Sequence, residues 1–226
     1  MDNLIGITEG ADPTINLKWR KWVQVDKRPA IIISKAPSKL IPMLDGTENI
    51  IIHCTITGLG GTLVEPKINP YPVELEAYHK LCNLFGKERI VLRIDPIIYN
   101  SVSDINPYKT IAKEAEGRMR ISFLDLYPHV KQRFDKQSIL VSQSDFHQPL
   151  QWRNLVWKEL GKPEVCAEPD IPSSPCVGIE DCKILNVIPS TDLKGQRKLC
   201  GCLANKVELC TRPPKCTYGC LYCYWR

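Results

Sequence analysis

The sequence predicts an α/β protein built on a parallel sheet or barrel, because short apolar segments alternate with helical patterns along the chain. The apolar segments are rich in Ile, Val and Leu and end in polar or turn residues, as strands of a buried parallel sheet do. The 226 residues suffice for one substantial core or two small ones. Apolar residues make up 43% and charged residues 24%, which excludes a disordered or coiled-coil chain.

Six segments are predicted to be strands, at 30–33, 50–57, 89–94, 119–124, 138–141 and 206–209. Helical spacing of apolar residues predicts three helices between them. The first begins at Pro72 and stops before Gly86, and the second begins at Asn106 and ends at Gly117. The third covers 149–160 and is closed by a glycine. Proline at the start and glycine at the end are typical helix boundaries. From 163 onward the chain is rich in proline and lacks periodicity, which predicts an irregular connector ordered by bound metal.

Cysteine is the residue whose abundance is abnormal. There are 11, and only Cys54 and Cys82 lie before residue 166. The first residues have neither a basic nor an apolar region typical of a secretory signal, so we expect the chain to stay in the cytoplasm. In a reducing compartment, clustered cysteines bind metal more often than they form disulfides. No apolar run approaches the ~18 residues that cross a bilayer, which predicts no membrane partner.

The sharpest motif is a C-x3-C-x2-C triplet formed by Cys216, Cys220 and Cys223. Its short spacings allow one tight loop to direct three sulfurs at three corners of an iron–sulfur cubane, leaving one iron open to a small molecule. A structural zinc site instead needs four ligands, usually as two C-x2-C pairs, and this chain has one such pair. From spacing alone, zinc or a purely structural cluster remains an alternative.

The triplet resembles the cluster motif of radical S-adenosylmethionine (SAM) enzymes, including the aromatic residue before the third cysteine, here Tyr222. In that superfamily the motif lies near the beginning of the domain, whereas here it closes the sequence. The chain is identified as a member of an uncharacterised bacterial family with such a cluster at its C-terminus. The segments that carry this resemblance are 57–60, 65–66, 86–96, 121–127, 195–202 and 219–224, while 1–28 and 206–210 depart from it.

This resemblance implies a partial (β/α)6 TIM-like barrel, permuted so that the cluster loop is C-terminal, with chemistry at the carboxyl mouth of the strands. The chain then divides into a barrel portion (1–162), a cysteine-rich connector with a candidate auxiliary metal site (163–205), and a last strand with the cluster loop (206–226). The resemblance also implies a 4Fe–4S cluster on the triplet and SAM bound to its fourth iron. Reductive cleavage of SAM gives a 5′-deoxyadenosyl radical, which abstracts hydrogen from substrate.

Residues just after the predicted strands are expected to share the barrel mouth with the triplet. They are Lys35, Thr57, Arg93, Asp95, Asp125, Ser142 and Ser144. Arg93 and Asp95 either hold SAM or substrate or form a plain ion pair. Cys54 is either a hydrogen-atom donor or a small core residue.

Two further groups have roles that the resemblance suggests. Gly58, Gly60 and Gly61 either seat SAM, as the glycine-rich strand end of the superfamily does, or form an ordinary strand-to-loop turn. The auxiliary site, an iron–sulfur cluster or a zinc ion, would use four cysteines. They are Cys166, Cys182, Cys200 and Cys202, with Cys176 as a substitute for Cys182.

A weaker similarity indicates the substrate. Residues 93–96 and 220–224 resemble segments of enzymes related to spore photoproduct lyase, which act on thymine-derived lesions in DNA. We therefore predict hydrogen abstraction at a thymine-type or hypermodified base, flipped out of DNA, leading to isomerisation or bond cleavage. Such a base also occurs in phage pathways of thymidine hypermodification. An electron donor such as flavodoxin or ferredoxin is the expected partner.

The charge of the chain does not decide whether its partner is DNA. The net charge is +5, and residues 194–226 contain seven Lys or Arg against one acid. This basic tail either faces the phosphates of DNA or offsets the negative charge of thiolate ligands. Two alternatives therefore stand beside the prediction. One is a radical SAM enzyme that acts on a peptide or small metabolite, and the other is a nucleic-acid-binding module stapled by zinc.

Overall fold

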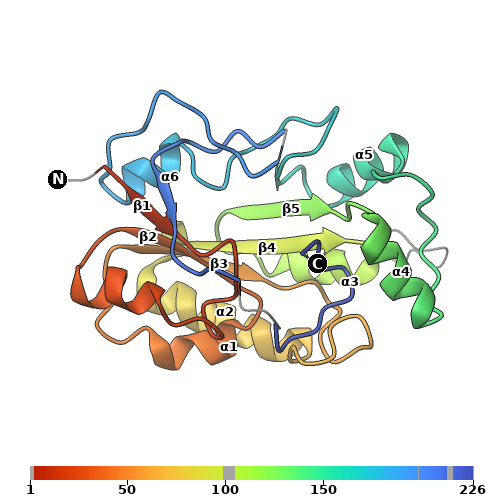
Figure 1. Ribbon diagram of the computed structural model, residues 1–226, viewed down its shortest axis with the longest axis horizontal. Coiled ribbons are helices and arrows are strands. Elements are labelled where there is room, and N and C mark those ends of the chain that lie inside the picture. The colour runs from red at the N-terminus through yellow and green to blue at the C-terminus, as the bar shows by residue number, and fades with distance from the viewer. Residues whose placement is uncertain (1–2, 99–104, 198, 213–215, 226) are drawn as a thin grey trace.

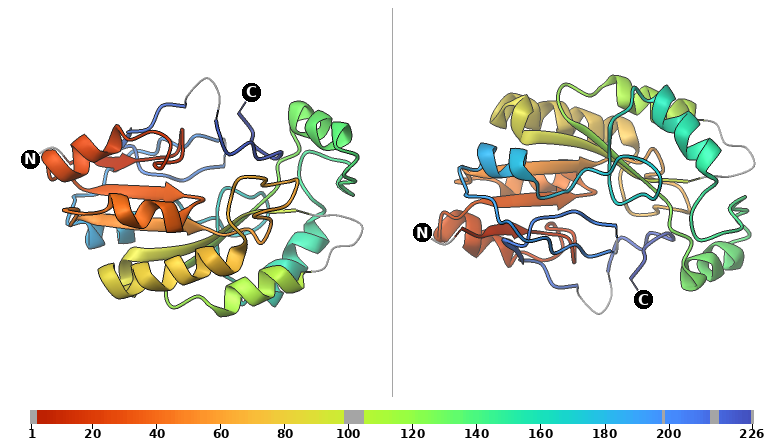
Figure 2. Two further views of the ribbon diagram at one scale, coloured as in Figure 1. Left: turned by 90° about the horizontal axis from the view of Figure 1, so that it is seen from below. Right: turned by 90° about the horizontal axis from the view of Figure 1, so that it is seen from above.

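The computed structural model describes residues 3–98, 105–197, 199–212 and 216–225. In these residues the centre is a curled sheet of seven parallel strands that forms a half-barrel (Figures 1 and 2). The strands are β1 (Ile5–Ile7), β2 (Ala30–Ser34), β3 (Ile50–Thr55), β4 (Ile90–Ile97), β5 (Met119–Phe123), β6 (Glu164–Val165) and β7 (Lys206–Glu208). Their order across the sheet is β6-β5-β4-β3-β2-β1-β7, so the strand nearest the C-terminus pairs with the first strand of the chain.

Helices cover one side of this sheet, and the irregular connector covers the other. The α-helices of the described residues are α1 (Pro37–Leu40), α2 (Tyr71–Phe85), α3 (Asn106–Lys113), α4 (Pro128–Lys136), α5 (Leu150–Glu159) and α6 (Ile179–Ile184). Shorter helical turns of other types span Lys21–Val25, Ile41–Met43 and Lys87–Arg89. Figure 1 shows α1 and α2 below the sheet and the blue connector with α6 above it. Within the described ranges, no helix is long and apolar enough to cross a bilayer.

Both faces of the central strands are buried, which explains the runs of consecutive apolar residues at the start of β2, β3 and β4. Alternate residues of β3, such as Ile50 and Ile52, pack on the helix side in a core with Leu75 and Tyr78 of α2. The intervening Ile51 belongs to a second core on the opposite face, which we call the inner face. The second core consists of strand residues Ile5, Ile7, Ile31, Ile51 and Val91 together with Cys166, Cys176, Cys182, Cys202 and their apolar neighbours.

Ion pairs fasten the connector to the end of the sheet. Arg118, just before β5, contacts Glu164 of β6 at 2.9 Å and Asp181 of α6 at 2.7 Å. The fully buried Arg120 of β5 also pairs with Glu164. The surrounding guanidinium groups lower the pKa of the Glu164 carboxyl against the raising effect of burial. The connector is mostly irregular, as predicted, and it contributes β6 and α6 besides.

Five of the six predicted strands are confirmed, and the sixth is wrong. Residues 138–141 follow α4 as an irregular segment in which Leu140 is 70% exposed. Its neighbours Ile139 and Val141 pack beside α4 and the C-terminal segment instead of pairing with a strand. The helix expected from Asn106 to Gly117 ends earlier, at Lys113. The sequence prediction missed β1 and β6, which have three and two residues.

Candidate functional site

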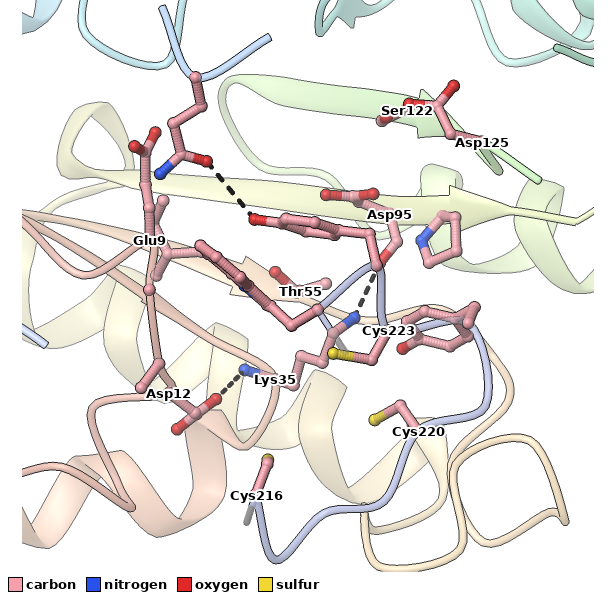
Figure 3. Close-up of a pocket in the computed structure, with 18 of the residues that line it drawn as sticks. Glu9, Asp12, Lys35, Thr55, Asp95, Ser122, Asp125, Cys216, Cys220 and Cys223 are labelled. Atoms are coloured by element: carbon pink, nitrogen blue, oxygen red, sulfur yellow. Dashed lines mark hydrogen bonds between the residues drawn. The ribbon is translucent and has the colours of Figure 1, made fainter. Parts of the chain in front are cut away.

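A cavity of about 520 Å³ opens at the carboxyl ends of the strands, and we call it the mouth cavity. Its volume lies in the range of sites for cofactors and small molecules. Segments far apart in the sequence supply its walls, including the residues after β1 and β2, the end of β4, the residues after β5 and the C-terminal segment (Figure 3). The polar and sulfur-bearing residues labelled there are Glu9, Asp12, Lys35, Thr55, Asp95, Ser122, Asp125, Cys216, Cys220 and Cys223.

The three cysteines of the C-terminal triplet line the mouth cavity together. In Figure 3 the sulfurs of Cys216, Cys220 and Cys223 point toward the same part of the pocket, close to Lys35. The three sulfurs do not all lie within 4.8 Å of one another. Thiolates on a cubane bind different irons and need this wider spacing.

Burial raises the pKa of the Cys220 thiol to about 12 even though the nearby Lys35 ammonium acts in the opposite direction, so this thiol is neutral at pH 7 in the absence of a metal. A coordinating metal deprotonates a thiol outright. Three half-buried cysteines that face one cavity therefore form a donor set that fits the predicted 4Fe–4S cluster.

Glu65 anchors the loop that carries the triplet. Its carboxylate is 2% exposed and accepts hydrogen bonds from the Tyr222 hydroxyl and, at 2.6 Å, from the Thr57 hydroxyl. Lys35 Nζ lies 3.7 Å from the same carboxylate and 4.7 Å from the centre of the Tyr222 ring. The backbone N–H of Leu221 also donates to the carbonyl of Val64 at 3.0 Å. Tyr222 thus lines the mouth cavity while its hydroxyl is held by a buried acid.

Helix α4 supports the other side of the loop. The Arg133 guanidinium donates to the Cys223 carbonyl, and a ring nitrogen of His129 lies 2.7 Å from the Tyr224 carbonyl. Partial burial lowers the pKa of Arg133, which nonetheless stays far above neutral pH as an arginine. In the sequence, Glu65 stood out only as part of the segment 65–66 that carries the family resemblance, with no role assigned, and Arg133 did not stand out, because nothing in their local pattern indicates a contact with the C-terminal loop.

Ionic contacts order the polar groups of the mouth cavity. Arg93 and Asp95 form an ion pair whose two members both line the cavity. Lys35 Nζ donates to the Asp95 carbonyl at 2.8 Å, and the Lys35 backbone N–H donates to the Asp12 carboxylate at 2.7 Å. Asp125 accepts a hydrogen bond from Arg197 at 2.6 Å. The Arg93–Asp95 pair therefore exists as the plain ion-pair interpretation expects, and it faces the space that a ligand would occupy.

Of the residues predicted to share the mouth with the triplet, some line the mouth cavity and others do not. Lys35, Arg93, Asp95 and Asp125 line the mouth cavity with the triplet, and Thr57 lies behind it on Glu65. The prediction for Ser142 and Ser144 is wrong, because they follow a segment that is not a strand and lie outside the cavity lining.

Cys54 and the three candidate glycines lie away from the cavity lining. Cys54 is fully buried in the helix-side core, where burial raises the pKa of its thiol well above the ordinary value. Gly58 and Gly61 both have φ of +79°, and the Gly61 N–H donates to the Glu65 carbonyl at 3.1 Å. Gly60 pairs with Glu65 as an isolated bridge. These positions agree with the core and turn interpretations, and the glycine turn presents Glu65 to the cluster loop.

Four connector cysteines form a second sulfur group, which we call the thiol quartet: Cys166, Cys176, Cys200 and Cys202. Cys176 occupies the place that the sequence analysis gave to Cys182, whose thiol instead contacts Asn205. The hydrogen bond between Cys200 and Cys202 lowers the pKa of the Cys200 thiol. A carboxylate oxygen of Glu9 and the sulfurs of Cys176 and Cys202 all lie within 4.8 Å of one another. Glu9 escaped the sequence analysis because it follows β1, a strand too short to be predicted.

The comparisons with known proteins concern the chain as a whole. Neither the curated proteins nor the solved structures give a match. One family model, described as a domain of unknown function (DUF1848), matches residues 17–225. This match spans nearly the whole chain, from before β2 to the end of the cluster loop. The protein with the half-barrel, the mouth cavity and the cysteine triplet therefore belongs to the DUF1848 family.

Proposed function

We propose that the protein is a radical SAM enzyme whose 4Fe–4S cluster is held by Cys216, Cys220 and Cys223. The observation that carries the proposal is the convergence of these three sulfurs on a cavity at the carboxyl ends of parallel strands. In barrels of parallel strands, chemistry takes place at this end. When bound, the cluster and SAM together supply one-electron chemistry that removes hydrogen from an unactivated carbon.

Strand order supports the proposed permutation of the barrel. Strand β7 leads directly into the triplet and lies beside β1 at one edge of the sheet. If residues 206–226 preceded β1 in the chain, the strands would follow one another across the sheet in sequence order. The cluster loop would then follow the first strand, which is its place in the superfamily that the motif resembles.

The residues of the chain have separate tasks in this proposal. Lys35 brings a positive charge next to the thiolates, and Glu65 fixes both Lys35 and the loop. Asp12 and the Arg93–Asp95 pair offer charged groups to the polar ends of a ligand in the mouth cavity. The connector closes the inner face and excludes water from a reactive radical.

A base-type substrate is favoured by the aromatic groups at the cavity. Tyr224 and Trp225 are both partly exposed, and their rings stack with centroids 5.1 Å apart. The Arg212 guanidinium lies over the Trp225 ring at 5.8 Å from its centroid. Aromatic rings with neighbouring arginines are the platforms on which single-stranded bases stack. We therefore propose a thymine-type or hypermodified base of DNA as the substrate, with flavodoxin or ferredoxin as electron donor.

The test is SAM cleavage by anaerobically reconstituted protein, measured as 5′-deoxyadenosine released under reduction. We expect Cys216→Ala, Cys220→Ala and Cys223→Ala each to abolish the release, because each cysteine would hold one iron. Cys82→Ala on α2 is the matched control and should leave the release intact. Cleavage that survives loss of any triplet cysteine would contradict the cluster assignment.

The same assay, repeated with different candidate substrates, tests whether the substrate is a DNA base. Release that increases only with DNA containing the modified thymine would support a DNA base. Equal release with a peptide or a free metabolite would contradict it while leaving the radical SAM assignment in place.

A further inference from the structure

We propose a second metal centre, a zinc ion bound by the four thiolates of the thiol quartet, Cys166, Cys176, Cys200 and Cys202, on the inner face of the half-barrel. The proposal goes beyond the proposed function and does not depend on it. It differs from the auxiliary site predicted from sequence in one ligand, since Cys176 replaces Cys182, and it assigns the metal.

Sulfur distances are the first argument. The Sγ atoms of Cys166 and Cys176 lie 3.7 Å apart, and those of Cys200 and Cys202 lie 3.3 Å apart. The backbone N–H of Cys176 donates to the Cys202 sulfur at 3.2 Å, which joins the two pairs. With Zn–S bonds of about 2.3 Å, two sulfurs of a tetrahedral site lie about 3.8 Å apart. Each sulfur of the quartet thus has a neighbour at close to the spacing of a single-ion site, and the two pairs would draw together around the ion, because the four sulfurs do not all lie within 4.8 Å of one another.

The short distances within the two pairs argue against two other uses of the four cysteines, a cubane and a disulfide. Thiolates on a cubane bind different irons and lie farther apart than thiolates that share one ion. A disulfide needs a sulfur–sulfur distance of about 2.05 Å. All eleven cysteines lie in the described ranges and are free thiols.

Charge on the inner face is the second argument. A zinc ion with four thiolates carries a net charge of −2, which must be compensated when it is buried. Arg120 is buried and Arg93 is largely buried beside the quartet, and the charge of Cys176 acts on both guanidinium groups. Each arginine has one acidic partner, yet Nε of Arg93 and both Nε and Nη1 of Arg120 have no hydrogen-bond partner in the part of the chain described. A thiolate–zinc centre would supply the missing negative charge.

Position gives the centre a structural purpose. The four cysteines come from two parts of the connector, which has little regular structure, and they meet over Ile5, Ile7 and Ile31 of the sheet. Closing four thiolates on one ion would fasten both parts to the inner face. Cys166, Cys176 and Cys200 also line the mouth cavity, so the ion would form part of its inner wall.

Glu9 is the one competing ligand within reach. Its carboxylate lies within 4.8 Å of the sulfurs of Cys176 and Cys202, but it is paired with Lys206 at 2.9 Å. Zinc in structural sites prefers four thiolates to a carboxylate that already has a cationic partner. We therefore assign Glu9 to Lys206 and the four sulfurs to the metal.

The test is metal content of the full chain purified with added zinc and iron, measured by mass spectrometry. We expect one zinc per chain in the wild-type protein, and its loss in Cys176→Ala and Cys202→Ala. Cys182→Ala is the matched control, because Cys182 is equally buried in the same core and lies outside the quartet. Cys223→Ala should also keep its zinc, which separates this centre from the triplet.

Cobalt substitution counts the ligands. In Cys166→Ala or Cys200→Ala loaded with Co²⁺, the thiolate-to-cobalt absorption band should fall by about a quarter, since one of four sulfurs is missing. Glu9→Gln should leave the band unchanged. Loss of metal in Glu9→Gln, with full retention in Cys166→Ala and Cys200→Ala, would overturn the four-thiolate assignment.

A measurement on the wild-type chain tests the zinc centre even if the cysteine variants do not fold. Titration with a mercurial thiol reagent in the presence of a zinc-sensitive dye should release one zinc as the quartet reacts. Reaction of the connector cysteines without release of zinc, or release of iron and sulfide from them, would refute the zinc centre.

Discussion

Glu65 is the residue that connects the local motif to the rest of the site. The spacing of the cysteine triplet is local, so the sequence alone indicated a loop that presents three sulfurs to one ligand. The partners of that loop are not local: Glu65 lies 157 residues before Tyr222, and their contact depends on the fold. The same reason hid Glu9, which reaches Cys176 and Cys202 only through the sheet.

Gly219 is the residue within the triplet loop whose backbone is most demanding. Its φ of +68° is a conformation that favours glycine. We expect Gly219→Ala to lower the free energy of unfolding by about 1 kcal/mol and to reduce the iron incorporated on reconstitution, because the strain falls between Cys216 and Cys220. Unfolding in urea and iron analysis measure the two effects.

Gly46→Ala is the matched control for this prediction. Gly46 has φ of +69°, with open space around the added methyl group. Gly46→Ala should lower the free energy of unfolding by a similar amount and leave the iron content unchanged. Equal iron content in both variants would show that the backbone at Gly219 does not shape the cluster loop.

At the scale of elements, burial decides which strands are visible in the sequence. Strands β2 to β4 are buried on both faces and contain runs of consecutive apolar residues, and β5 alternates apolar residues with the buried Arg120 and Ser122; both patterns predict strands. The strands that were not predicted, β1 and β6, have only three and two residues, whereas the three-residue β7 lies within the predicted strand 206–209. Residues 138–141 have the composition of a strand but no adjacent strand to pair with. Their apolar side chains pack on α4 instead.

Glu168 joins three elements and makes stability depend on pH. Its buried carboxylate accepts the Phe123 N–H of β5 at 3.0 Å and lies 3.4 Å from the Arg153 guanidinium of α5. Burial raises its pKa from 4.5 to about 7. Between these values the folded state binds the proton more tightly than the unfolded state, so stability is lost as pH rises through this range.

We therefore predict a difference between the wild-type protein and Glu168→Gln. The glutamine keeps the hydrogen-bonding shape without the charge, so its free energy of unfolding should exceed that of the wild type at pH 8 by up to about 3 kcal/mol. Below pH 4.5 the two proteins should be nearly equally stable. Urea unfolding at several pH values measures the difference. A constant difference across the range would mean that Glu168 does not titrate in this way.

At the scale of the whole molecule, the open inner face of the half-barrel is covered by the irregular connector and not by further strands and helices of a barrel. The sequence analysis predicted the parallel α/β architecture, because alternation of strands and helices is visible along the chain. It could not predict that the connector would cover the inner face, since irregular segments have no period. The result is a mouth cavity whose walls include the triplet, three cysteines of the thiol quartet and the basic residues Arg133, Arg197 and Arg212.

These arginines lead to a prediction for DNA binding. On single-stranded DNA, each phosphate neutralised should contribute about 0.7 to the steepness of log affinity against log salt concentration. We expect binding of single-stranded DNA to weaken steeply with salt, and Arg212→Ala to reduce the steepness by about 0.7. Lys80→Ala, an exposed lysine on α2, is the control and should keep the slope. Fluorescence anisotropy from low to high salt gives the values, and binding that is insensitive to salt would argue for a peptide or a small metabolite.

The central claim is that the triplet holds an iron–sulfur cluster with one iron open to SAM. Its most direct test is iron and sulfide analysis of anaerobically prepared protein, with an electron paramagnetic resonance spectrum of the reduced state before and after SAM is added. The account predicts four irons and four sulfides per chain and a spectrum that changes when SAM binds. Zinc at the triplet without iron or sulfide, or a cluster whose spectrum is unaffected by SAM, would contradict it.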